Sequence, residues 1–98
     1  MLFSVYLATG PNRFTETVCQ PREFVGTIEA ETVGVAYHKT QNLTETWNKE
    51  NPGRSVSVGD VLVDPSYNKL MVIGVGFKDI TKEICPDVAN ITNSNMAG

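Results

Sequence analysis

Apolar stretches separated by short polar clusters run along this chain and predict a small β-rich domain. Leu2–Ala8 is a short apolar run, typical of a central strand that is buried on both faces. Two further strands are predicted at Phe14–Cys19 and Phe24–Ala30. In the second, Phe24, Gly26 and Ile28 would share one face. Val61–Val63 and Leu70–Val75 flank a cluster of turn residues and predict a hairpin.

The segment Glu31–Asn42 fits two templates. Val33, Ala36 and Tyr37 repeat at helical spacing, whereas Val33, Val35 and Tyr37 alternate as in a strand. We expect a helix, because the segment ends in a polar run whose cations would lie near the negative end of the helix dipole. The predicted fold is therefore α+β: a mixed or antiparallel sheet of four to five strands, with this helix packed on one face.

The segment Arg54–Val61, with the sequence RSVSVGDV, carries a break in its alternation. Val56 and Val58 share one face of an extended chain, but the valines of the following strand fall on the other. The slip occurs at Gly59-Asp60 and predicts a tight turn or a β-bulge at the entrance of that strand.

Two other segments carry weaker local signals. Asn42–Glu45 has the character of a capping box and predicts a single helical turn that presents Trp47. Pro86 limits any helix within Thr81–Val88, so we assign no element there.

The size and charge of the chain narrow the classes of protein. Its 98 residues suffice for one domain, which we assign to residues 1–89, followed by a flexible tail over residues 90–98. The net charge is −3 and the basic residues are scattered, whereas proteins that bind phosphate backbones present a basic stripe. We therefore expect no direct nucleic-acid binding. No stretch approaches the roughly 20 apolar residues of a membrane span, and we expect a cytoplasmic protein.

Residues that carry chemistry are few. Cys19 and Cys85 lie far apart without a CxxC pair, and two thiols alone do not make a zinc site. In the cytoplasm they would remain reduced, whereas a disulfide between them would need an oxidising compartment. His38 is the only histidine, and P-loop, GxGxxG and HExxH motifs are absent. We expect a protein that is not an enzyme, with no catalytic residue, metal or cofactor.

The octet RSVSVGDV at Arg54–Val61, followed by Gly76-Phe77, resembles the RSLSVSDVV…GF pattern of YodL-like domains from phages, plasmids and integrative elements. A Thr-Gln-Asn step at residues 40–42 and Trp47 upstream are similar to features of small phage proteins. The resemblance covers Thr40 to Phe77, and Gly59 stands where serine is common. It implies a mobile-element origin, a compact α+β domain and a role in phage–host conflict, and it brings no catalytic residues.

The polar residues at this strand entrance allow two interpretations. In the structural one, Asp60 accepts hydrogen bonds from nearby backbone N–H groups, and Arg54 pairs with Asp60 or another acid. In the functional one, Arg54 offers a planar fork to a carboxylate or phosphate, and Trp47 offers a stacking or anchor face. Trp47 also fits a structural role as a lid on the core. The candidate binding residues are Gln41, Asn42, Trp47, Arg54, Ser55, Ser57 and Asp60.

Three functions are compatible with these observations. The first is a phage or mobile-element accessory protein that binds and inhibits a host or defence component in the host cytoplasm, with Trp47 and Arg54 as anchors. The second is a protein that sequesters a small, nucleotide-like ligand. The third is a structural or self-assembling virion component that forms a homo-oligomer.

Overall fold

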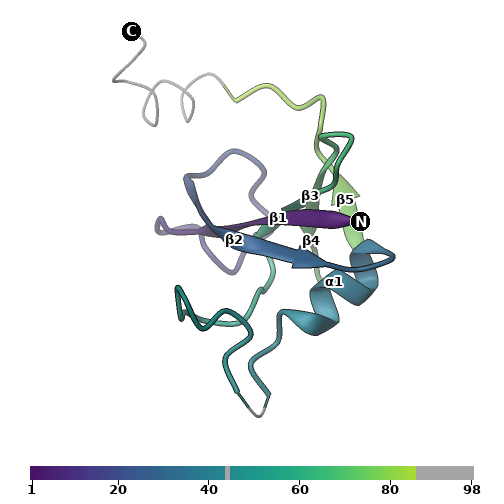
Figure 1. Cartoon of the computed structure of the whole chain (residues 1–98). Coiled ribbons are helices and arrows are strands. Elements are labelled where there is room, and N and C mark those ends of the chain that lie inside the picture. Colours follow the sequence, from purple (N-terminus) through teal and green to yellow (C-terminus); the bar gives the residue numbers. More distant parts are fainter. Residues whose placement is uncertain (44, 86–98) are drawn as a thin grey trace, which may run out of the picture.

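The computed structural model describes residues 1–43 and 45–85 of the chain, and in these residues one antiparallel sheet carries one helix (Figure 1). The elements are β1 (Leu2–Ala8), β2 (Arg22–Glu29), α1 (Val33–Lys39), β3 (Val61–Val63), β4 (Lys69–Val72) and β5 (Phe77–Asp79). The five strands are ordered β2-β1-β3-β4-β5, and every neighbouring pair is antiparallel. This confirms the predicted α+β class and the antiparallel form of the sheet.

β1 is a central strand, as its apolar composition predicted, and it pairs with β2 on one side and β3 on the other. Phe3, Val5 and Leu7 point to one face of the sheet and are buried there. Ser4 and Tyr6 point to the other face and are only half-buried. The side chains of β1 were expected to be buried on both faces of the sheet. Burial is complete only on the face that α1 covers.

α1 confirms the predicted helix but is shorter at both ends. Thr32 is its N-cap, and the side-chain oxygen accepts a hydrogen bond from Val35 N–H at 3.2 Å. Ala36 lies fully buried against the sheet. The helix ends at Thr40, whose N–H bonds to the carbonyls of Ala36 and Tyr37. The helix therefore ends within the polar run at residues 38–42, after His38 and Lys39 in its last turn.

Two apolar clusters lie on opposite faces of the sheet. The larger one, on the α1 side, comprises Phe3, Val5, Leu7, Ala30, Ala36, Val56, Leu62 and Val72. The smaller one comprises Val61, Met71 and Ile80, with Tyr6, Val18, Val63 and Ile73 packed around it. The long connection between α1 and β3 lies on the α1 side (Figure 1). Its residues Val56 and Trp47 join the larger cluster.

The hairpin of β3 and β4 confirms the predicted pairing, although β4 ends at Val72 rather than Val75.

The predicted strand at Phe14–Cys19 is wrong. Phe14 has a φ of +71°, and Thr15 N–H bonds to Asn12 C=O at 3.2 Å, so this segment turns instead of extending. The short strand β5 was not predicted, because three residues are too few for alternation to be visible.

The predicted helical turn at Asn42–Glu45 is wrong for the part that the structure describes, which leaves out residue 44. Leu43 and Glu45 are not helical, and the Asn42 side-chain oxygen accepts a hydrogen bond from Trp47 N–H at 3.0 Å. The asparagine therefore closes a wider loop instead of capping a helix. The expected tail at residues 90–98 lies outside the described residues, as does the end of Thr81–Val88.

Cys19 and Cys85 form a disulfide, with their Cα atoms 5.3 Å apart and a separation of 66 positions in sequence. The bond joins the connection between β1 and β2 to the segment that follows β5, beside the smaller apolar cluster. The sequence left open whether the two cysteines pair, and in the structure they do. In the described part of the chain, no helix is long and apolar enough to cross a membrane.

Candidate functional site

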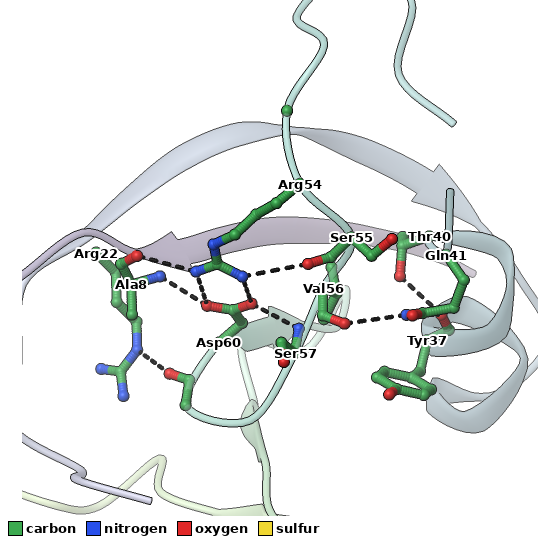
Figure 2. A network of polar contacts seen from close by, with 12 residues as sticks. Ala8, Arg22, Tyr37, Thr40, Gln41, Arg54, Ser55, Val56, Ser57 and Asp60 are labelled. Carbon is green, nitrogen blue, oxygen red and sulfur yellow. Dashed lines mark hydrogen bonds and ion pairs between the residues drawn. The ribbon is translucent and has the colours of Figure 1, made fainter. Parts of the chain in front are cut away.

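The carboxylate of Asp60 is the centre of the polar segment and is fully buried. One oxygen accepts hydrogen bonds from Ala8 N–H at 2.7 Å and from Arg54 Nη2 at 2.8 Å. The other accepts from Ser57 N–H at 2.7 Å and from Arg54 Nη1 at 2.6 Å, as Figure 2 shows. Four donors fill the lone-pair positions of the two oxygens, so the carboxylate has no capacity left for a ligand.

The register of the sheet explains why an ion pair is buried at this place. Ser4 and Tyr6 of β1 pair with β3, and Ala8 is the next residue whose backbone faces that side. β3 does not reach this far. Asp60 accepts from Ala8 N–H instead, and Arg54 Nη2 donates to Ala8 C=O at 2.9 Å. The two side chains therefore take the place of a missing strand partner.

The turn that delivers Asp60 into this position depends on glycine. Asp60 N–H bonds to Ser57 C=O at 3.0 Å, which closes the tight turn that the parity break predicted. Gly59 has a φ of +93°, and a Cβ there would lie 2.5 Å from the carbonyl oxygen of Thr15. The YodL-like pattern has serine here, and a serine side chain does not fit this turn without movement of the chain at Thr15.

Gly59→Ser is therefore expected to lower the free energy of unfolding by about 1–3 kcal/mol. Urea denaturation of the variant beside the parent protein measures the change. Gly53→Ala is the matched control, since a Cβ at Gly53 meets no atom within 4 Å. Its effect should stay within about 0.5 kcal/mol. Equal stabilities of the two variants would contradict the requirement for glycine in the turn.

A second guanidinium, that of Arg22, holds the connection between β1 and β2 against the same turn. Its donors bond to four carbonyls and one sulfur at 2.8 to 3.4 Å. The acceptors are the carbonyls of Thr17, Val18, Gln20 and Gly59 and the sulfur of Met71. Burial lowers the pKa of Arg22, and the negative charge of Asp60 partly opposes this. With its donors in use, Arg22 serves the fold and not anion binding.

Gln41 joins the end of α1 to the polar segment. Its side-chain nitrogen donates to Tyr37 C=O and to Val56 C=O, both at 3.0 Å (Figure 2). A backbone hydrogen bond from Val56 N–H to Thr40 C=O at 3.4 Å runs beside it. The Thr40–Gln41 step of the predicted site therefore positions Val56 in the core.

Asn42 closes the loop that follows α1. Its N–H donates to Ser55 Oγ at 2.7 Å, and its side-chain nitrogen donates to Gly53 C=O at 2.7 Å. The side-chain oxygen accepts from Trp47 N–H, so one asparagine ties together both ends of the loop and its middle. The backbone of Trp47 is thereby fixed relative to the sheet.

The structure brings six of the seven candidate residues into one hydrogen-bonded chain of contacts, in which Arg54 also donates to Ser55 C=O at 3.2 Å. These contacts are internal. The Arg54 side chain is 28% exposed, and its guanidinium lies 4.7 Å from the centroid of the Phe14 ring, which covers it. Trp47, the seventh residue, joins them only through the hydrogen bond of its backbone N–H to Asn42, and its ring lies against Gly26 of β2. No group of three metal-ligating residues occurs in the described part of the chain.

A hollow lies between β2 and the loop that Asn42 closes, and we call it the β2 groove. Its volume is about 860 Å³. Phe24–Ile28 form one wall, and Lys39, Gln41, Leu43 and residues 45–51 form the other. Half-buried Trp47 packs on the core and also lines the groove. Sequence reasoning found Trp47 but missed the β2 wall, because a strand edge exposes backbone groups that no side-chain pattern reports.

A second hollow of about 690 Å³ lies on the opposite face of the sheet, beside the disulfide. Its apolar lining comes from Tyr6, Val18, Val61, Val63, Tyr67, Ile80 and Ile84. None of the seven candidate residues lines it, so it is separate from the polar segment.

Comparison of the chain with protein-family models, with curated proteins and with solved structures finds no significant match.

Proposed function

We propose that this chain is a non-catalytic binding module that captures a protein partner in the β2 groove. The observation that carries the proposal is the groove itself, which is walled by a fixed Trp47 and by Leu43, whose side chain is 76% exposed. Aromatic residues in preformed pockets are the usual anchors of protein interfaces. The polar segment also helps to shape the groove, because the hydrogen bond from Trp47 N–H to the Asn42 side chain fixes the position of Trp47.

Charge in the groove favours a protein partner over a nucleic acid. Lys39 and Lys49 are balanced by Glu45 and Glu50, and Lys49 pairs with Glu45 at 3.0 Å. A phosphate backbone would find little excess of positive charge here. Arg54, the other anchor expected from sequence, contributes to the fold instead because its donors are engaged with Asp60 and with backbone carbonyls.

The biological setting that we propose is a phage or mobile-element accessory protein that binds and blocks a host or defence component. The similarity of Arg54–Val61 to the YodL-like pattern supports it. A place in the host cytoplasm belongs to the same proposal. The disulfide limits the proposed cytoplasmic location. Cytoplasmic reductants keep such bonds reduced, so the domain must be stable without the bond in that compartment.

Affinity capture from host lysate with groove variants tests the proposal. Leu43→Arg places a charged chain in the groove and is expected to lower recovery of the partner at least about tenfold, the scale of a lost hot spot. Val75→Arg is the matched control, because Val75 is 91% exposed and lies outside the groove, and it should leave recovery unchanged. Both variants replace exposed side chains, so both should melt like the parent protein.

Equal recovery with the two variants would contradict a partner in the groove. If no protein is captured and a panel of nucleotides raises the melting temperature, the chain is instead a small-ligand sequestering protein.

A further inference from the structure

β2 is an edge strand, and its pairing with β1 shows which of its backbone groups face outward. Met1 N donates to Ala30 C=O at 2.6 Å, and Ala30 N–H donates to Met1 C=O at 2.8 Å, which makes this a hydrogen-bonded pair. Bonded and non-bonded pairs alternate along an antiparallel ladder. Thr27, opposite Ser4, is therefore a non-bonded partner of β1, and its N–H and C=O point toward the free edge of the sheet.

Side chains cover the outward carbonyls on either side of Thr27. The carbonyl of Val25, the extra residue at the β2 bulge, accepts from the amides at both ends of the Asn48–Asn51 loop at 2.6 and 3.2 Å. The carbonyl of Glu29 accepts from Lys39 Nζ at 3.0 Å. Among the described residues no hydrogen bond reaches the N–H or C=O of exposed Thr27. One donor and one acceptor of the edge thus remain open in the β2 groove.

We propose that a short extended segment of the partner binds in the β2 groove as an added strand, with main-chain hydrogen bonds to Thr27 N–H and C=O. An outward N–H and C=O on one residue are matched in distance and direction by another strand, which is how edge strands take up peptides. The inference rests on the proposed function and names the part of the partner that is recognised.

The faces of the groove fix the side-chain chemistry of that segment. On the α1 side of the sheet, Ile28 and Trp47 pack against the core and Leu43 is exposed beside them. On the other side, Thr27 and Glu29 are exposed to solvent. Since successive side chains of a strand alternate between faces, the bound segment carries apolar residues at every second position and polar residues between them.

A single strand suits the groove better than a second copy of this chain. Two copies paired edge to edge through Thr27 would each bring a loop that is anchored at Val25. Each loop would then meet the Glu29 and Lys39 end of the other copy. An extended segment brings no loop of its own and so avoids this contact.

Thr27→Pro tests the main-chain contact. Proline removes the outward N–H but no bond to β1, and edge strands tolerate it at such positions. Thr27→Val keeps the N–H and is the matched control. Linear peptides are selected on the parent protein from a random display library, and their affinities are measured by fluorescence anisotropy. We expect Thr27→Val to bind within about twofold of the parent and Thr27→Pro to bind more than about tenfold more weakly.

A second measurement needs no variant of the protein. The selected peptides are resynthesised with N-methyl groups on alternate amides, because only every second amide of an added strand faces β2. Methylation in one parity should abolish binding to the parent protein, and methylation in the other should leave it unchanged. Equal tolerance of both parities, or a selection that yields no peptide, overturns the inference, even if Thr27→Pro itself fails to fold.

Two outcomes separate this inference from the proposed function. If lysate capture is lost in Leu43→Arg but unchanged in a folded Thr27→Pro, the groove binds a partner without strand addition and only the inference fails. If sedimentation shows a dimer that Thr27→Pro dissociates, a second copy occupies the edge and the inference is likewise overturned.

Discussion

Asp60→Asn is expected to destabilise the domain by about 3–5 kcal/mol, the cost of breaking a buried ion pair from one side. The asparagine amide has one acceptor oxygen and one nitrogen that only donates, whereas all four positions around the Asp60 carboxylate are occupied by donors. Its nitrogen would face either Ala8 N–H or Ser57 N–H without an acceptor. Urea denaturation should show a lower midpoint with an unchanged m-value.

Asp79→Asn is the matched control for charge removal. Asp79 is exposed, and hydrogen bonds from the Thr81 side chain and N–H to its carboxylate hold its pKa below the ordinary range. Its replacement should cost less than about 1 kcal/mol. Similar losses from both replacements would contradict the central role of Asp60.

A double variant tests whether Asp60 and Arg54 replace a strand partner of Ala8 or form an ordinary buried ion pair. If Asp60 and Arg54 only neutralise each other, Arg54→Met with Asp60→Leu should restore much of the stability lost in the single variant. If they replace a strand partner, Ala8 N–H and C=O remain buried without partners, at about 1–3 kcal/mol for each group. We therefore expect the double variant to remain destabilised, and recovery of parental stability would disprove the strand-substitute account.

Loss of the disulfide is expected to have an effect of similar size. Reduction, or the pair of replacements Cys19→Ser and Cys85→Ser, should lower the free energy of unfolding by about 4 kcal/mol in the chain-entropy model. The value is large because the two cysteines are 66 residues apart, so the bond restricts most of the unfolded chain. Urea denaturation with and without a reductant measures it.

The serine variant is the internal control for that experiment, since the reductant should not change its stability. Intact mass will show the loss of two hydrogens in the oxidised parent protein. If oxidised and reduced protein unfold at the same urea concentration, the bond does not stabilise the fold. A reduced domain that remains folded at growth temperature would be compatible with the proposed cytoplasmic location, and one that unfolds would not.

Local pattern predicted the elements whose own residues carry a periodic or turn signal. The apolar run of β1, the hairpin of β3 and β4, the helix around Ala36 and the turn at Gly59-Asp60 were all visible from periodicity or a parity break. The pairing of Asp60 with Arg54 was also among the structural alternatives. These features are set by steric preference and by alternation over a few residues, which the sequence carries directly.

Only the tertiary structure decided features that join distant segments. Phe14–Cys19 was expected to be a strand, yet it pairs with none of the five strands of the sheet and folds as turns. Arg22 holds these turns against the tight turn at Gly59 by donating to the carbonyls of Thr17 and Gly59. The order of the strands left Ala8 facing a gap, which is why Asp60 is buried instead of exposed for binding. It also left β2 at an edge and created the groove beside Trp47. The reason is physical: an unpaired N–H or C=O has no side-chain signature, and which groups remain unpaired depends on strands that lie far apart in the chain.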